Sequence, residues 1–149
     1  MKDIGLRLQV GHADGLCPTP ENAFNNDFVI IAHNGIHKVS LDYCACDGAA
    51  SKPVQLIRTR LYPATVQDPK TAATFAVLEH FQLLSFTSKL SHYEYYRALT
   101  RLTDNTGVGY TVVSYFNVYD KTLLIEYFAS RIVIRPFLGS FISGIMFDC

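Results

Sequence analysis

Hydrophobic and polar positions alternate over much of the first third of the chain, a pattern typical of half-buried β-strands. Residues 5–11 predict a short strand, and residues 12–20, rich in Gly and Pro, predict a structured loop. Residues 27–46 contain two β-rich arms on either side of Asn34 and Gly35. Because Asn and Gly both tolerate a positive φ, this pattern predicts a β-hairpin.

Alternate residues of the second arm should lie on opposite faces of the strand. One face would hold His37, Val39, Leu41 and Tyr43, and the other Lys38, Ser40, Asp42 and Cys44. We expect Asp42 to face solvent. We expect Cys44 and Cys46 to point the same way if the strand stays extended.

The next segments change from a strand pattern to a helical one. Residues 54–61 predict one more strand, which Pro63 ends. Asp68 followed by Pro69 predicts a helix start, with Asp68 as the N-cap. This helix would run over residues 69–84, where apolar residues recur with helical spacing.

A second helix is expected over residues 91–104. Ser91 and Glu94 have the spacing of a capping box, and Leu90 and Tyr95 that of a hydrophobic staple. The two helices should pack through the apolar residues Phe81, Leu84, Leu99 and Leu102. The predicted fold class is α+β, with a β-rich N-terminal half containing a hairpin, followed by a two-helix unit.

Charge and hydropathy narrow the functional classes. The 149 residues carry 13 basic and 13 acidic side chains, so no general attraction to nucleic acid or anionic membrane is expected. The N-terminal residues are too polar for a signal peptide. The apolar run at 136–147 is shorter than the ~20 residues of a spanning helix. We expect an intracellular protein with neither a membrane partner nor a small-molecule substrate.

One short segment departs from this neutral balance. Lys52, Arg58 and Arg60 have no acidic residue between Asp47 and Asp68. Arg58 and Arg60 would share a face of the predicted strand and could contact nucleic-acid phosphates. The alternative, a solvated strand face, is the commoner origin of such a pair.

Cysteine and histidine provide the main candidate chemistry. His12, Cys17, Cys44 and Cys46 together offer four soft ligands, as a structural Zn²⁺ site requires. His37 is an alternative fourth ligand, although alternation puts it on the opposite face from Cys44. In a reducing compartment a disulfide is less expected. A metal site and simply buried thiols remain open alternatives at this point.

Catalytic patterns are weaker. Asp42 lies in mid-strand, as the first metal-binding Asp of an RNase H-like nuclease would, but nothing in the sequence makes other carboxylates converge on it. The sequence contains neither a Gly-x-Ser-x-Gly motif nor a phosphate-binding glycine loop. We therefore expect a protein that is not an enzyme.

Four long motifs occur in a family's order and spacing: "GLRLQVGHADGLCPTP", "NGIHKVSLDYCAC", "PVQLIRTRLYPATVQDPKTAATFAVLEHFQLLS" and "SKLSHYEYYRALTRLTDNTG". Over residues 4–107 the chain resembles the second type of CxC cysteine-cluster domain associated with KDZ (Kyakuja–Dileera–Zisupton) transposases of fungi. Family members carry a Cys/His-rich stretch upstream of the "GLR" motif, so the resemblance implies an N-terminally truncated domain.

The resemblance implies a transposon-derived, zinc-stabilised accessory module that contacts DNA or a KDZ transposase, in the nucleus. Cys17, Cys44 and Cys46 would carry the cluster, with His12 and His37 in matching places. An inert transposon remnant is the first alternative, and an RNase H-like nuclease fragment using Asp42 is the second.

The resemblance stops at Gly107. Residues 108–149 are crowded with Val, Ile, Phe and Tyr and lack clear capping and turn signals. Every Val codon begins with GT, the bases that usually start an intron, and Val108 follows Gly107 directly. We therefore predict that 108–149 is a non-matching tail of uncertain structure, translated from an unspliced intron or other non-coding sequence.

Overall fold

The structure is a computed structural model that describes residues 7–12 and 15–104. These residues form a six-stranded mixed sheet with three α-helices and one 3-10 helix. The strands are β1 (Arg7–Gln9), β2 (Pro20–Asn22), β3 (Phe28–Ala32), β4 (Gly35–Cys44), β5 (Leu61–Pro63) and β6 (Thr71–Thr74). The helices are η2 (Phe24–Asn26), α1 (Lys52–Arg58), α2 (Phe75–Ser88) and α3 (His92–Thr103).

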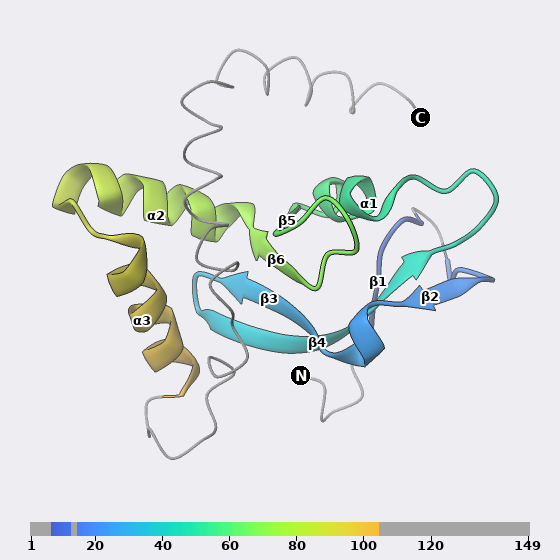
Figure 1. The fold of residues 1–149 in the computed structure, drawn as a ribbon, viewed down its shortest axis with the longest axis horizontal. Helices are drawn as coiled ribbons and strands as arrows, with labels where there is room; N and C mark the ends of the chain where they lie inside the picture. The colour runs from blue at the N-terminus through green and yellow to red at the C-terminus, as the bar shows by residue number, and fades with distance from the viewer. Residues whose placement is uncertain (1–6, 13–14, 105–149) are drawn as a thin grey trace, which may run out of the picture.

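Strand β4 is the longest strand and pairs with three others (Figure 1). Its first half pairs antiparallel with β3, with Ala32 opposite Gly35 at the hairpin turn. Its second half lies between β1, which is parallel, and β2, which is antiparallel. The main sheet order is β1-β4-β3-β6-β5. The end of β4 is therefore held from both sides.

Strand β3 separates two hydrophobic cores because its side chains alternate between faces and are nearly all buried. Val29 and Ile31 pack with α2 and α3, whereas Phe28 and Ile30 pack in a second cluster with Leu56 of α1. Both faces of the sheet are covered, α2 and α3 lying on one face and α1 on the other. A near-continuous apolar run is the expected sequence of such a strand.

The α+β class, the hairpin and the order of β-rich half followed by two helices are confirmed. The capping box of α3 is also confirmed: Ser91 accepts a hydrogen bond from the Glu94 N–H, and Glu94 accepts one from the Ser91 N–H. Phe81 and Leu99 lie in the same buried cluster, against which Leu84 packs. Leu102 is 63% exposed, so its predicted place in the helix–helix contact is wrong.

The predicted strand over residues 54–61 is wrong, because residues 52–58 form helix α1. Ser51 lies at the N-cap, and Pro53 occupies the first turn, where its missing N–H costs no hydrogen bond. Gln55 and Leu56 are its buried residues. Only Leu61 of the predicted strand belongs to a strand, β5.

The predicted helix start at Asp68 is also wrong. Asp68 has a φ of 42°, which is left-handed and not an N-cap conformation. The next residues form β6, which pairs with β3 and β5, and the helix begins only after Thr74. The Thr74 hydroxyl accepts a hydrogen bond from the Val77 N–H at 3.2 Å and so caps α2.

Two further predictions from the sequence concern membrane-spanning segments and the C-terminal tail. In the described part of the chain, no helix has both the length and the apolar character needed to cross a membrane. The tail hypothesis for residues 108–149 lies outside the described residues and stays a prediction.

Candidate metal centre

Three segments meet at the carboxyl end of β4. Gln9 of β1 pairs with Asp42, so the chain beyond β1 brings His12 past the end of β4 on one side. Pro20 of β2 pairs with Cys44, so the loop before β2 brings Cys17 there on the other side. Cys44 is the last residue of β4, and Cys46 follows two residues later. The strand pairing thus gathers residues that are far apart in sequence.

The side chains of these four residues form a compact ligand group. One ligand atom from each of His12, Cys17, Cys44 and Cys46 lies within 4.8 Å of all the others. Cys46 Sγ is 3.4 Å from His12 Nε2 and 3.5 Å from Cys17 Sγ. A tetrahedron with metal–ligand bonds of about 2.0–2.3 Å has edges of roughly 3.3–3.8 Å. The group therefore has the dimensions of a single metal site.

His37, the alternative ligand, does not belong to this group. Its Nε2 lies 3.1 Å from Oδ1 of Asn34, at the hairpin turn. The turn is at the opposite end of β4 from Cys44. Among the residues that the structure describes, no second group of three or more His, Cys, Asp or Glu side chains is close enough to hold a metal ion.

The thiols of the group differ in acidity. The Thr19 hydroxyl, 3.3 Å from Cys46 Sγ, and then the His12 ring and the other two thiols lower the pKa of Cys46 to about 6. For Cys44, the Cys46 N–H favours the thiolate, but burial and the neighbouring thiols outweigh it and raise the pKa. The lowered pKa of Cys46 favours its thiolate, the form that binds a metal ion.

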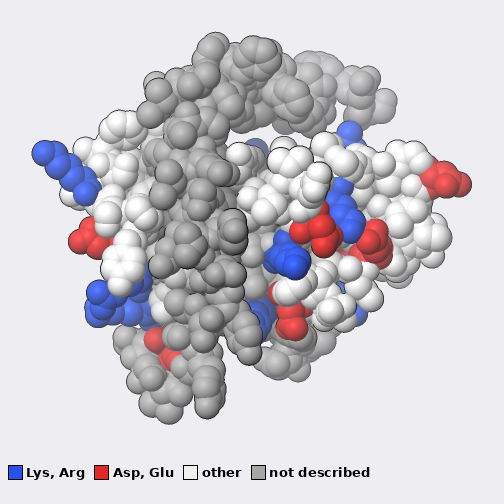
Figure 2. Space-filling view, in the orientation of Figure 1, with Lys and Arg blue, Asp and Glu red and all other residues white. Residues whose placement is uncertain are grey.

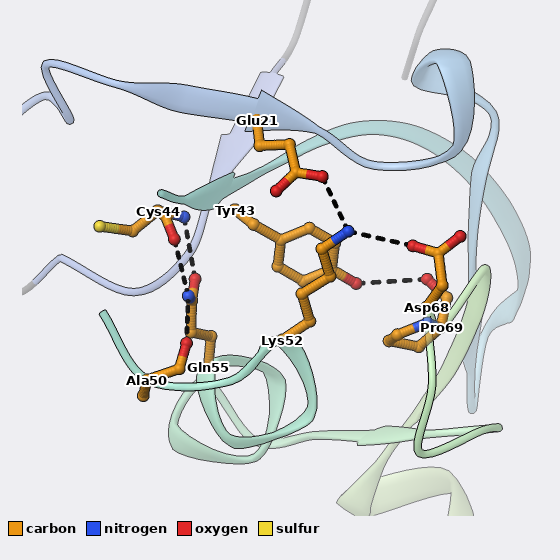
Figure 3. A network of polar contacts seen from close by, with 8 residues as sticks. All are labelled: Glu21, Tyr43, Cys44, Ala50, Lys52, Gln55, Asp68 and Pro69. Atoms are coloured by element: carbon orange, nitrogen blue, oxygen red, sulfur yellow. Dashed lines mark hydrogen bonds and ion pairs between the residues drawn. The ribbon is translucent and has the colours of Figure 1, made fainter. Parts of the chain in front are cut away.

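Gln55 of α1 fixes the backbone of Cys44 (Figure 3). Its Oε1 accepts a hydrogen bond from the Cys44 N–H at 2.9 Å, and its Nε2 donates to the Cys44 carbonyl at 2.9 Å. The same Nε2 donates to the Ala50 carbonyl at 2.7 Å. The Gln55 residue is only 2% exposed, so these hydrogen bonds are shielded from water. They link the ligand-bearing strand end to helix α1.

Gly11 fits against this link and leads directly into His12. A Cβ at Gly11 would lie 2.7 Å from Gln55 Cδ and 2.8 Å from Cys44 Cβ. Its φ of +93° is also one that residues with a side chain rarely adopt. Sequence reasoning missed both Gln55 and Gly11. The only signal was the position of Gly11 beside a candidate ligand.

Asp42 is buried, and the expectation that it faces solvent is wrong. Arg7 Nη1 donates to its two carboxylate oxygens at 2.7 and 2.8 Å, and to Asn22 Oδ1 at 2.6 Å. These bonds tie β1 and β2 to β4 just before the ligands. Asp42 thus has a structural partner, and it is outside the metal-ligand group.

The three basic residues of the 52–60 segment do not share one surface, because Lys52 begins helix α1 and Arg58 and Arg60 lie at its end. Lys52 Nζ is 2.8 Å from Glu21 and 3.1 Å from Asp68, and it lies 5.5 Å from the centre of the Tyr43 ring (Figure 3). Arg58 ends α1 and Arg60 follows it with a φ of 61°, so the shared strand face predicted for them is wrong. Both are exposed. Their role in nucleic-acid binding stays a prediction.

Figure 2 shows how charge is distributed over one face of the described part. Basic and acidic side chains are interspersed there, and neither sign forms a continuous field. This agrees with the equal numbers of acidic and basic residues in the chain. Any contact with a polyanion on this face would depend on a few residues.

Comparison with known proteins adds one finding. The family model described as "CxC2 like cysteine cluster associated with KDZ transposases" matches residues 1–107, which confirms the resemblance. No curated protein and no solved structure matches the chain. The match includes all four residues of the ligand group, two of which form the Cys-x-Cys pair at 44 and 46.

Proposed function

The chain belongs to the family of CxC2-like cysteine clusters associated with KDZ transposases, and on that premise we propose that it acts as a non-catalytic, zinc-binding accessory module of a transposon-derived protein. The observation that carries the proposal is the convergence of His12, Cys17, Cys44 and Cys46 within 4.8 Å. Three thiols and one imidazole are a usual ligand set of structural zinc.

The ligand count favours a structural role for the metal. Catalytic zinc is held by three protein ligands and keeps a fourth position open for water or substrate. Here four side chains can fill the tetrahedron, so a bound ion would join the loops before β2 and after β1 to the end of β4. Zinc would supply this cross-link. The four residues would hold the ion, and their thiols would bind it as thiolates.

The partner of the module would be DNA or a KDZ transposase, within the nucleus. Support for DNA comes from Arg58 and Arg60, which are exposed at the end of α1. Lys52 would contribute less to DNA binding, because its ammonium group already forms ion pairs with Glu21 and Asp68. Support for a transposase comes from the family association alone.

Metal content of the purified full-length chain tests the proposal. We expect about one Zn²⁺ per chain by mass spectrometry, and its loss in Cys17→Ser and Cys46→Ser. Structural zinc in small domains contributes on the order of 10 kcal/mol, so a chelator should unfold or strongly destabilise the protein. His37→Ala is the matched control and should keep its metal. A metal-free protein indifferent to chelators would overturn the proposal and favour an inert remnant.

The partner is tested separately with double-stranded DNA at several salt concentrations. Arg58→Ala and Arg60→Ala should each weaken binding and reduce the salt dependence by about one counterion, and Lys89→Ala is the control. Absence of retention at moderate salt would leave the transposase as the proposed partner. Mg²⁺-dependent DNA cleavage lost in Asp42→Ala would instead favour the nuclease alternative.

A further inference from the structure

The three thiols of the ligand group are not held equally. Cys46 Sγ lies 3.5 Å from Cys17 Sγ, and Cys46 is the more exposed residue, whereas Cys17 is 8% and Cys44 6% exposed. The Cys44 backbone is fixed on both sides by Gln55, and its Sγ lies 3.5 Å from the Cys46 N–H. Cys46 is therefore the most exposed of the three cysteines, and the Cys17 sulfur lies 3.5 Å from its own.

We propose that Cys17 and Cys46 form a redox modification site, in which a peroxide converts the pair to a disulfide, Cys44 stays a thiol, and bound metal is released. Metal release rests on the proposed zinc site. The disulfide itself requires only the two thiols and can be tested without metal.

The chemistry is a two-electron oxidation. Cys46 sulfur attacks one peroxide oxygen, the O–O bond breaks, and a sulfenic acid forms while the other oxygen leaves as water after protonation. Cys17 sulfur then attacks the sulfenic sulfur, the S–S bond forms, and the sulfenic oxygen leaves as a second water. The two sulfurs lose two electrons and hydrogen peroxide gains them. A zinc ion that loses two of its four ligands in this way is no longer held.

The fold is already arranged to tolerate this disulfide. Pro20 pairs with Cys44, and the Ala45 N–H donates to the Thr19 carbonyl at 3.1 Å, so the loop and the strand end lie side by side before any bond forms. A disulfide bond is about 2.05 Å long. The two sulfurs, 3.5 Å apart, must approach by roughly 1.5 Å to form it. The disulfide would replace the metal as the link between the same two segments.

The alternative pair, Cys44 with Cys46, is less suited. The two residues are neighbours along one chain segment, so their disulfide would close a small ring and would need Cys44 to leave its present backbone conformation. Gln55 opposes that movement with hydrogen bonds to both the N–H and the carbonyl of Cys44. We expect one product and a single unreacted thiol among the three.

The test treats full-length protein, zinc-loaded and metal-free, with hydrogen peroxide, and then maps disulfides and free thiols by alkylation and mass spectrometry. We expect about one Cys17–Cys46 disulfide per chain, alkylation at Cys44, release of zinc to a chromophoric chelator in step with disulfide formation, and an unchanged far-ultraviolet circular dichroism spectrum. Cys149→Ser keeps both thiols and should still form the disulfide.

The outcomes separate the two proposals. A zinc-loaded protein that forms a Cys44–Cys46 bond, intermolecular disulfides or no disulfide would overturn the redox site and leave the zinc module standing. A protein that is purified without zinc, does not bind added Zn²⁺ and still forms the Cys17–Cys46 disulfide would support the redox pair and overturn the zinc module.

Discussion

Gln55 and Cys44 share two hydrogen bonds of 2.9 Å, one to each polar group of the Cys44 backbone. Through this pair a buried side chain of α1 sets the position of a strand end that carries two candidate metal ligands. Residues around a metal site that touch its ligands often matter nearly as much as the ligands. The pair therefore provides the first test of how the centre is supported.

Gln55→Leu keeps the side-chain volume but removes three hydrogen bonds and leaves Cys44 backbone groups unpaired. We expect the free energy of unfolding to fall by on the order of 2–4 kcal/mol. Zinc affinity, measured by competition with a chelator, should fall about 10- to 100-fold. Gln67→Leu, at an exposed position, is the control. Equal zinc affinity in the two variants would show that Gln55 does not position the ligands.

Gly11→Ala and Gly48→Ala form a matched pair, because both glycines have positive φ angles, +93° and +79°. Open space surrounds Gly48, whereas a Cβ at Gly11 would meet Gln55 and Cys44. Gly48→Ala should cost about 1–2 kcal/mol for backbone strain. Gly11→Ala should cost a further 1–3 kcal/mol or so for overpacking. Denaturant unfolding measures both, and equal losses would show that the space around Gly11 relaxes freely.

Leu99→Ala and Leu102→Ala test the packing of α3. Leu99 is 1% exposed and lies in the cluster with Val77 and Phe81, whereas Leu102 is 63% exposed. We expect Leu99→Ala to lower the free energy of unfolding by about 2–5 kcal/mol. Leu102→Ala should change it by less than about 0.5 kcal/mol. A large loss at Leu102 would mean that another part of the chain or a partner covers it.

Alkaline pH should destabilise the protein through two buried tyrosines. Burial raises the pKa of Tyr95 to about 12, and burial together with the charges of Asp68 and Glu21 raises the pKa of Tyr43. An unfolded tyrosine titrates near pH 10, so between about pH 10 and 12 the unfolded state binds fewer protons than the folded state. The contribution of these tyrosines to the free energy of unfolding is therefore fully present below pH 10 and is lost as the pH rises.

Denaturant unfolding at pH 8 to 11.5, with tyrosinate absorbance in parallel, checks this alkaline loss of stability. Tyr95→Phe should be less stable at pH 8, since it loses a 2.8 Å contact with His80, but should lose less stability above pH 10. Tyr93→Phe, at a half-exposed position, should match the unmodified protein. The idea fails if Tyr95→Phe and the unmodified protein show the same pH dependence.

Short sequence motifs correctly predicted the structural features that depend on only a few neighbouring residues. Asn34-Gly35 predicted the hairpin, because a turn is set within a few residues; the observed loop is His33-Asn34, and Gly35, with a positive φ, begins β4. Ser91 and Glu94 predicted the start of α3, because the capping box satisfies backbone groups of the same turn. Among the ligands, Cys44 and Cys46 were predicted to point the same way, and the four candidate ligands do meet.

The segments that were predicted wrongly are those whose secondary structure depends on contacts with distant parts of the chain. Residues 71–74 lie where the Asp68-Pro69 signal favoured a helix, but pairing with β3 and β5 makes them a strand. Ala72 and Ala73 are fully buried there, small enough to fit between the covered faces of the sheet. Residues 54–61 were predicted to be a strand although residues 52–58 form α1, because a short apolar run fits a strand and a helix alike. The pairing of Arg7 with Asp42 spans 35 residues and had no local signal.

Strand β4 also sets a length scale for any partner of the module. Gly35, at one end, lies against Thr103 at the end of α3, where Thr103 Oγ1 accepts a 2.7 Å hydrogen bond from the Ile36 N–H. Cys44, at the other end of the strand, belongs to the ligand group. At about 3.3 Å per residue the two ends are roughly 30 Å apart. A DNA duplex touching both would cover about nine base pairs, so shorter oligonucleotides can report on only one end of the molecule.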